Sequence, residues 1–93
     1  MHRQKEHTLV VTDGPNVGQR YQLREVVSTV GRTAGNAIVL DSVQISRHHA
    51  HIQLTPTGAI IEDAGSTNGT WVNDRRLVGS QVLTSGDRVR FAD

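Results

Sequence analysis

The sequence contains no cysteine, so disulfide bonds and thiolate metal sites are both excluded. No apolar run approaches the roughly 18 residues of a membrane-spanning helix, and we expect no membrane partner. Residues 1–7 are polar and charged and lack the apolar stretch of a secretory signal, which favours a cytoplasmic setting. A chain of 93 residues has room for one small hydrophobic core, which must be stable without covalent cross-links.

Large aromatic residues and lysine are also scarce. The three aromatics, Tyr21, Trp71 and Phe91, each lie in an apolar strand pattern, so we expect them to pack in the core rather than stack on nucleic-acid bases. Nine of the ten basic residues are arginine, whose planar guanidinium group suits oxyanions. The formal net charge of +1 is too small for general nucleic-acid affinity, and we expect no nucleic-acid partner.

What the chain has is a succession of short alternating segments. Ala50, Ile52 and Leu54 share one side of a predicted strand, with polar residues between them. Further strands are predicted at residues 8–12, 19–23, 28–30, 38–40, 59–62, 70–72, 81–83 and 88–91. Turn-forming residues separate them, and no window keeps a helical period beyond about two turns. The pattern predicts an all-β fold, a sandwich or barrel.

Four polar motifs, rich in hydrogen-bond donors, occur in a fixed order between these strands. They are Gly31-Arg32, Ser46-Arg47-His48-His49, Ser66-Thr67-Asn68-Gly69-Thr70 and Asn73. Cations, hydroxyls, an amide and flexible backbone are what loops need to hold a phosphate. The ordered set resembles the forkhead-associated (FHA) domain, from about Thr8 to Phe91. The resemblance implies an FHA/SMAD-like β-sandwich of two antiparallel-rich sheets, with recognition loops at one end, that binds phosphothreonine peptides.

The resemblance assigns phosphopeptide contacts to five residues. Arg32 and Arg47 would supply positive charge, and Ser46 would donate its hydroxyl to a phosphate oxygen. Thr67 would lie near the phosphate, and Asn68 would hold the backbone of the bound peptide. A phosphate near −2 charge can accept several charge-assisted bonds, each worth about 1.5–3 kcal/mol. A niche for the γ-methyl group would explain a preference for threonine over serine.

Other residues are expected to shape the site rather than touch the ligand. Those expected to support its structure are Gly31, His49, Asp63, Gly69 and Asn73. We assign Asn36 and Gln44 to the loops that would read the peptide beyond the phosphothreonine. The partner would be a protein phosphorylated by a serine/threonine kinase, in a bacterial signalling pathway.

The two ends of the sequence lead to predictions about the domain bounds and an unpaired edge strand. We assign residues 1–7 to a polar tail and residues 8–93 to the FHA domain. FHA domains usually continue with one more strand, which this sequence lacks after Phe91. We therefore expect an unpaired edge near residues 9–11, and such an edge favours dimer formation.

Three other functions are conceivable for this sequence: a metal site, an enzyme and a module that binds unphosphorylated partners. His48, His49 and His51 cluster, but no carboxylate or cysteine accompanies them at ligand spacing, so we predict no metal site and no cofactor. No nucleophile elbow, phosphate-binding loop before a helix or zincin motif is present, so we predict that the domain is not an enzyme. A module that binds unphosphorylated partners on the same fold stays open as the alternative function.

Overall fold

The computed structural model describes residues 7–10 and 17–92, which form strands and no helix. The strands are β1 (His7–Val10), β2 (Arg20–Leu23), β3 (Val27–Gly31), β4 (Ile38–Val39), β5 (Ala50–Thr55), β6 (Gly58–Asp63), β7 (Thr70–Val72), β8 (Arg75–Arg76), β9 (Ser80–Leu83) and β10 (Val89–Phe91). No helix long and apolar enough to cross a membrane is found among these residues. The all-β prediction is confirmed.

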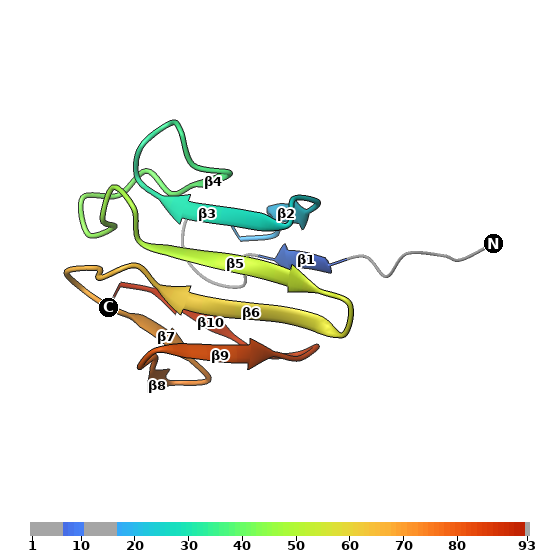
Figure 1. Cartoon of the computed structure of the whole chain (residues 1–93). Coiled ribbons are helices and arrows are strands. Elements are labelled where there is room, and N and C mark those ends of the chain that lie inside the picture. The colour runs from blue at the N-terminus through green and yellow to red at the C-terminus, as the bar shows by residue number, and fades with distance from the viewer. Residues whose placement is uncertain (1–6, 11–16, 93) are drawn as a thin grey trace.

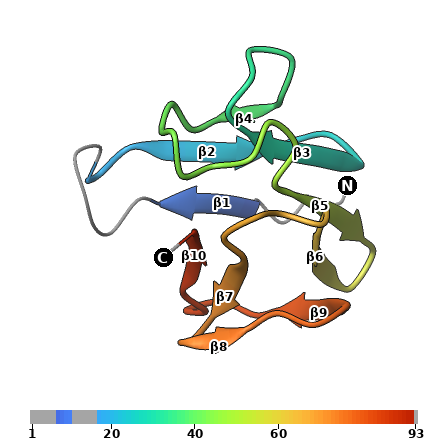
Figure 2. The ribbon, with the colours of Figure 1, turned by 90° about the vertical axis from the view of Figure 1, so that its left-hand side faces the viewer.

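Two layers make up the sandwich (Figures 1 and 2). One layer is a five-stranded sheet with the order β4-β3-β5-β6-β9. The other holds two smaller sheets, β1-β2 and β10-β7-β8, which are not hydrogen-bonded to one another in the described part of the chain. All pairs are antiparallel except β3 with β4. The second layer is therefore divided, whereas we expected a single sheet.

The core lies between the layers and follows the alternation of the central strands. Val30, Ile52 and Ile61, from β3, β5 and β6, have no exposed surface. Ile52 and Ile61 are also cross-strand partners, so their side chains share the inner face. Val72 from β7 and Leu77 complete the core from the opposite layer. Each buried branched side chain contributes roughly 1.5–3 kcal/mol relative to exposure, and this burial holds the strand ends in place.

Every predicted strand has a counterpart in the structure whose ends differ by at most one residue, apart from three larger differences. Residues 11 and 12 of the first predicted strand lie outside the described residues, as do residues 1–6 of the expected tail. His7, which we assigned to the tail, is the first residue of β1 and pairs with Leu23. Strand β8 was not predicted.

The prediction that all three aromatic residues pack in the core is wrong for Trp71. Tyr21 and Phe91 pack against the core as expected, but Trp71 does not. Its neighbours Thr70 and Val72 are buried, and because successive residues of a strand face opposite sides, Trp71 lies on the outer face.

Candidate functional site

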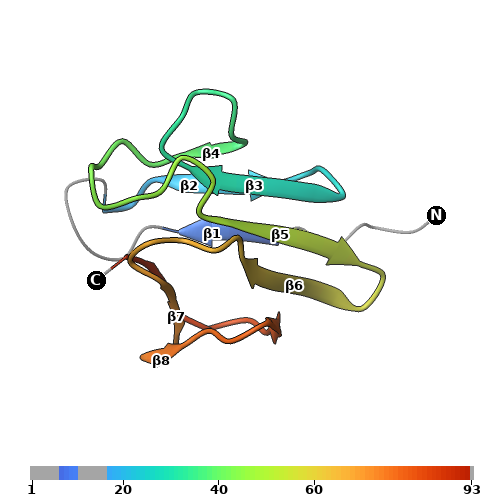
Figure 3. The same ribbon diagram turned by 60° about the vertical axis from the view of Figure 1, so that its left-hand side comes forward.

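Three loops gather at one end of the sandwich and form the candidate site (Figures 1 and 3). They are residues 32–37 between β3 and β4, residues 40–49 between β4 and β5, and residues 64–69 between β6 and β7. We call them the recognition loops. All four donor-rich motifs except Asn73 lie in these loops or at their boundaries.

The first two loops are joined by backbone contacts that require a glycine. The Arg32 N–H donates to the Ser46 carbonyl at 3.0 Å. A Cβ atom at Gly31 would lie only 2.0 Å from the Arg47 carbonyl oxygen, a distance that real side chains do not reach. The side chain of Asn36 strengthens this junction by donating to the Arg47 carbonyl at 2.8 Å. Arg32, Ser46 and Arg47 are therefore held on adjacent segments.

Asn36 is placed differently from our expectation. Asn36 is only 7% exposed, and its amide donates to Thr33 as well as to Arg47. A buried amide with these internal partners braces the loops and is poorly placed to read a peptide side chain. Gln44 is exposed and lies in the second loop, as expected. Thr33, which the motifs did not single out, also donates to the Arg47 carbonyl, at 3.2 Å.

Two hydrogen bonds join the second and third loops, and each leaves part of a polar side chain available for a ligand. The Thr67 N–H donates to the Ser46 hydroxyl oxygen at 3.0 Å, and the Asn68 amide donates to the Gln44 carbonyl at 2.8 Å. A hydroxyl that accepts a bond can still donate its own proton, and an amide that donates still has an acceptor oxygen. Within the described residues, no partner is recorded for the Ser46 proton or for Asn68 Oδ1. The site therefore offers one hydroxyl donor and one carbonyl acceptor to an external ligand.

His49 connects the same two loops from the protein interior. Its side chain has no exposed surface and both ring nitrogens are used: Nδ1 accepts from the Ser46 N–H at 3.1 Å, and Nε2 lies 2.7 Å from the Gly69 carbonyl. This pair of contacts is satisfied by the neutral tautomer with the proton on Nε2. The ring also meets the ring of Phe91 edge-on, with centroids 5.8 Å apart. His49 therefore bridges the second and third recognition loops.

Asp63 organises the third loop. Its carboxylate accepts hydrogen bonds from the Gly65 and Ser66 amides and from the Ser66 and Thr70 hydroxyls. Partial burial alone would raise the pKa of Asp63, but the hydrogen bonds from Ser66, Thr70 and Gly65 together lower that pKa below its ordinary value. Thr70, which is fully buried, was not among the predicted supporting residues. Ser66 also accepts from the Gly69 N–H at 2.9 Å, which fixes the end of the loop, where Gly69 has a φ of 85°.

Two guanidinium groups provide the charge of the site. Arg32 is half-buried and Arg47 is exposed, and neither forms an ion pair with a carboxylate of the described residues. Both flank Ser46, because Arg47 follows it in sequence and the Arg32 backbone is bonded to it. Arginines without counter-ions beside a free hydroxyl donor suit an oxyanion such as phosphate.

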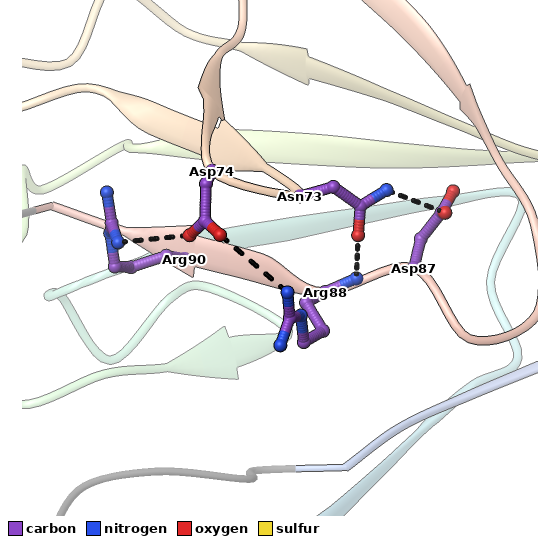
Figure 4. Close-up of polar contacts among 5 residues, drawn as sticks. All are labelled: Asn73, Asp74, Asp87, Arg88 and Arg90. Carbon is purple, nitrogen blue, oxygen red and sulfur yellow. Dashed lines mark hydrogen bonds and ion pairs between the residues drawn. The ribbon is translucent and has the colours of Figure 1, made fainter.

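Asn73 lies apart from the recognition loops, in the turn between β7 and β8 (Figure 4). Its amide donates to the Asp87 carboxylate and its side-chain oxygen accepts from the Arg88 N–H, both at 2.9 Å. The hydrogen bond from the Thr84 N–H, followed by that from Asn73, lowers the pKa of Asp87. Asn73 therefore secures the β10-β7-β8 sheet, and any support that it gives the site is indirect.

The histidine cluster does not form a metal site among the described residues, which contain no group of three or more histidine, cysteine or acidic side chains able to hold an ion. Both nitrogens of His49 are occupied within the protein. His51 lies 3.4 Å from the Glu62 carboxylate on the neighbouring strand. His48 is exposed beside Arg47 in the second loop.

Comparison with known proteins decides the family. The sequence profile of the FHA domain matches residues 28–92, which include all three recognition loops. The chain belongs to the FHA family. The glycogen accumulation regulator GarA of Mycobacterium tuberculosis is 44% identical over 83 residues, covering 89% of this chain and 51% of GarA. The chain thus spans about half the length of the curated relatives that it matches first.

Solved FHA structures agree with this assignment. A structure from a study of phosphothreonine-dependent FHA domain interactions has a TM-score of 0.85, with 35% identity, and covers 95% of this chain and 88% of that one. Mycobacterium tuberculosis EmbR, solved in complex with a low-affinity phosphopeptide, has a TM-score of 0.79 with 41% identity, covering 82% of this chain and 20% of EmbR.

The bridge made by His49 generates a first prediction. Replacing His49 with alanine leaves the Ser46 N–H without its partner, removes one of the two hydrogen bonds to the Gly69 carbonyl and empties a fully buried position. We expect a loss of about 3 kcal/mol in the free energy of unfolding. His49→Phe is the matched control, because it keeps a ring against Phe91 while removing both hydrogen bonds. Urea denaturation measures both variants. If His49→Phe were as stable as the wild type, ring packing rather than bridging would be the role of His49.

The hydrogen bonds to Asp63 generate a second prediction. Because its folded-state pKa is lowered, Asp63 stabilises the fold fully above its unfolded value, about pH 4, and this contribution is lost as the pH falls through the folded pKa. Asp63→Asn should therefore be less stable than the wild type at pH 7, and the difference should shrink below pH 4. Urea unfolding from pH 7 to pH 3 checks this, with exposed Asp41→Asn as the control for net charge. A difference that stays constant over this range contradicts the prediction.

Proposed function

We propose that this FHA domain binds a phosphothreonine-containing segment of a partner protein through its recognition loops. The observation that carries the proposal is the hydroxyl of Ser46. It accepts from the Thr67 N–H, so its proton is free to donate outward, and it is flanked by two arginines that lack carboxylate partners. A doubly charged anion with three acceptor oxygens complements this set.

The five predicted contact residues keep their proposed roles. Arg32 and Arg47 neutralise the phosphate, and Ser46 donates to one of its oxygens. The exposed Thr67 lies beside them because its backbone is bonded to Ser46. Asn68 holds the peptide through its side-chain oxygen, which suits a backbone N–H donor. The amide nitrogen is already bonded to Gln44, so Asn68 is oriented before the ligand arrives.

Gly31, His49, Asp63 and Gly69 support the site by the contacts described above. We reassign Asn36 from specificity to the same supporting set, because it is buried and bonded to Arg47. Gln44 keeps its proposed place among the residues that read the peptide beyond the phosphothreonine. A preference for threonine over serine would require a niche for the γ-methyl group, worth about 1 kcal/mol.

The relatives support a regulatory setting for the whole protein. One is a glycogen accumulation regulator, and another, from Corynebacterium efficiens, is an oxoglutarate dehydrogenase inhibitor that is 43% identical over 83 residues. We propose that this chain is the non-catalytic signalling domain of a bacterial, cytoplasmic protein. A serine/threonine kinase would phosphorylate its partner, and no metal or cofactor is required for binding.

Calorimetry with matched peptides tests the function. We expect measurable affinity for a phosphothreonine peptide and at least tenfold weaker binding of the same peptide with plain threonine, since the charge-assisted bonds are lost. Arg32→Ala should lower the affinity for the phosphopeptide at least tenfold, whereas Arg20→Ala, an exposed arginine of β2, should leave it unchanged. Equal affinity for both peptides would instead establish the phosphorylation-independent alternative.

The edge of β1 supports a proposal about assembly. β1 pairs only with β2 within the described residues, so its other edge can accept a strand. We propose that the domain comprises residues 8–93 with His7 added and that a second copy pairs at this edge. Light scattering across a concentration series should show a dimer that strengthens with concentration. A monomeric mass at the highest concentration would contradict this.

A further inference from the structure

A row of cationic and aromatic side chains crosses the outer face of the β10-β7-β8 sheet. Arg90, Trp71 and Arg76 are cross-strand partners in that order, one from each strand. The guanidinium carbons of Arg90 and Arg76 lie 4.8 Å and 5.5 Å from the Trp71 ring centroid. We call these three residues the arginine–tryptophan ladder. No predicted role in phosphothreonine binding accounts for it.

The surroundings of the ladder are positively charged. Arg88 lies two residues before Arg90, on the same side of the chain, and Asp74 reaches both arginines from the β7–β8 turn (Figure 4). The two contacts are long, at 3.7 Å and 3.6 Å, and the Asp74 side chain is 75% exposed. Exposed pairs of this kind contribute roughly 0–1 kcal/mol and exchange readily with other anions. Arg88 and Arg90 thus share the exposed carboxylate of Asp74, and Arg76 forms no ion pair with a carboxylate of the described residues.

The ladder is continuous with the recognition loops through Gly69. A Cβ atom at Gly69 would lie 3.0 Å from the Trp71 ring and 3.0 Å from Arg76 Nε. Gly69 follows Asn68 directly, and its carbonyl accepts from the Ala92 N–H just after β10. Asn68, the proposed peptide contact, is therefore one residue away from a position that touches Trp71 and Arg76.

We propose that the arginine–tryptophan ladder is a second contact surface that binds acidic residues of the same phosphorylated partner. This proposal rests on the proposed function, since the phosphothreonine places the acidic residues beside the ladder. Guanidinium groups stacked on an aromatic ring are already ordered, and their in-plane N–H donors point away from the ring toward a carboxylate. Fewer rotamers are lost on binding, so even exposed carboxylates gain affinity there.

An acidic protein segment fits this surface better than a nucleic acid. Arg76 in the ladder and Arg88 beside it can pair with two carboxylates at the spacing of a peptide. A nucleic acid needs many phosphate contacts, and the chain has a net charge of only +1. The sequence context that the domain selects would then include acidic residues outside the phosphothreonine itself.

Peptide extensions test the proposal. A short phosphothreonine peptide with neutral flanks is compared with versions that carry three aspartates, or three serines, beyond a flexible linker at either end. At low salt, we expect the aspartates at one of the two ends to raise the affinity about three- to tenfold, and the serines to have no effect. The gain should fall toward twofold or less at 0.5 M salt, because exposed charges are screened.

Variants assign the gain to the ladder. Arg76→Gln combined with Arg88→Gln should abolish the gain from the aspartates and leave the affinity for the short phosphopeptide within twofold of the wild type. Arg20→Gln combined with Arg24→Gln removes the same charge from the β1-β2 sheet and should preserve the gain. A gain that is lost equally in both double variants reflects net charge alone and overturns the proposal.

Direct binding to the ladder is followed through Trp71, the single tryptophan of the chain. An unphosphorylated peptide of aspartates at millimolar concentration should change its fluorescence, and Arg76→Gln with Arg88→Gln should remove the change. No change in the wild type overturns the ladder, as does stronger binding of a single-stranded DNA of equal charge. If the short phosphopeptide fails to bind while Trp71 still responds, the proposed function fails and the acidic surface stands.

Discussion

The buried imidazole of His49 is the constraint on which the recognition loops depend. It joins the Ser46 backbone to the Gly69 carbonyl, and Gly69 lies 20 residues after His49 in the sequence. A rigid buried ring with one donor and one acceptor can form both hydrogen bonds only when the two loops lie a fixed distance apart. That separation also brings the Thr67 N–H to the Ser46 hydroxyl. The orientation of the hydroxyl donor is thus a consequence of a core interaction.

Much of the fold was predictable because alternation in the central strands is enforced by the core. Ala50 and Ile52 face inward in β5, as their spacing predicts. Strand β8 was not predictable from hydrophobicity, since Arg75 and Arg76 carry no apolar signal. It forms because Asn73 and Asp74 adopt positive φ values of 51° and 67°, the geometry of a tight two-residue hairpin turn.

The sequence indicated which residues form the site better than it indicated the hydrogen bonds among them. The order of the motifs indicated which loops converge, because strand ends at one side of a sandwich lie together. The supporting role of Asn36 was not predictable, since its bond to the Arg47 carbonyl spans 11 residues and no local pattern signals it. Trp71 was wrongly placed in the core because a three-residue strand permits either face to turn inward. Only tertiary packing of Thr70 and Val72 decided it.

The outward position of Trp71 links the two surfaces of the domain. Had it faced the core, Arg76 and Arg90 would have had no ring to order them, and Gly69 would have had no bulky neighbour. Instead the third recognition loop rests against the Trp71 ring on one side and is held by His49 through the Gly69 carbonyl on the other. A side chain at position 69 would disturb both contacts, in addition to the strain at a φ of 85°. Glycine at this position therefore couples the geometry of the phosphate site to that of the cationic face.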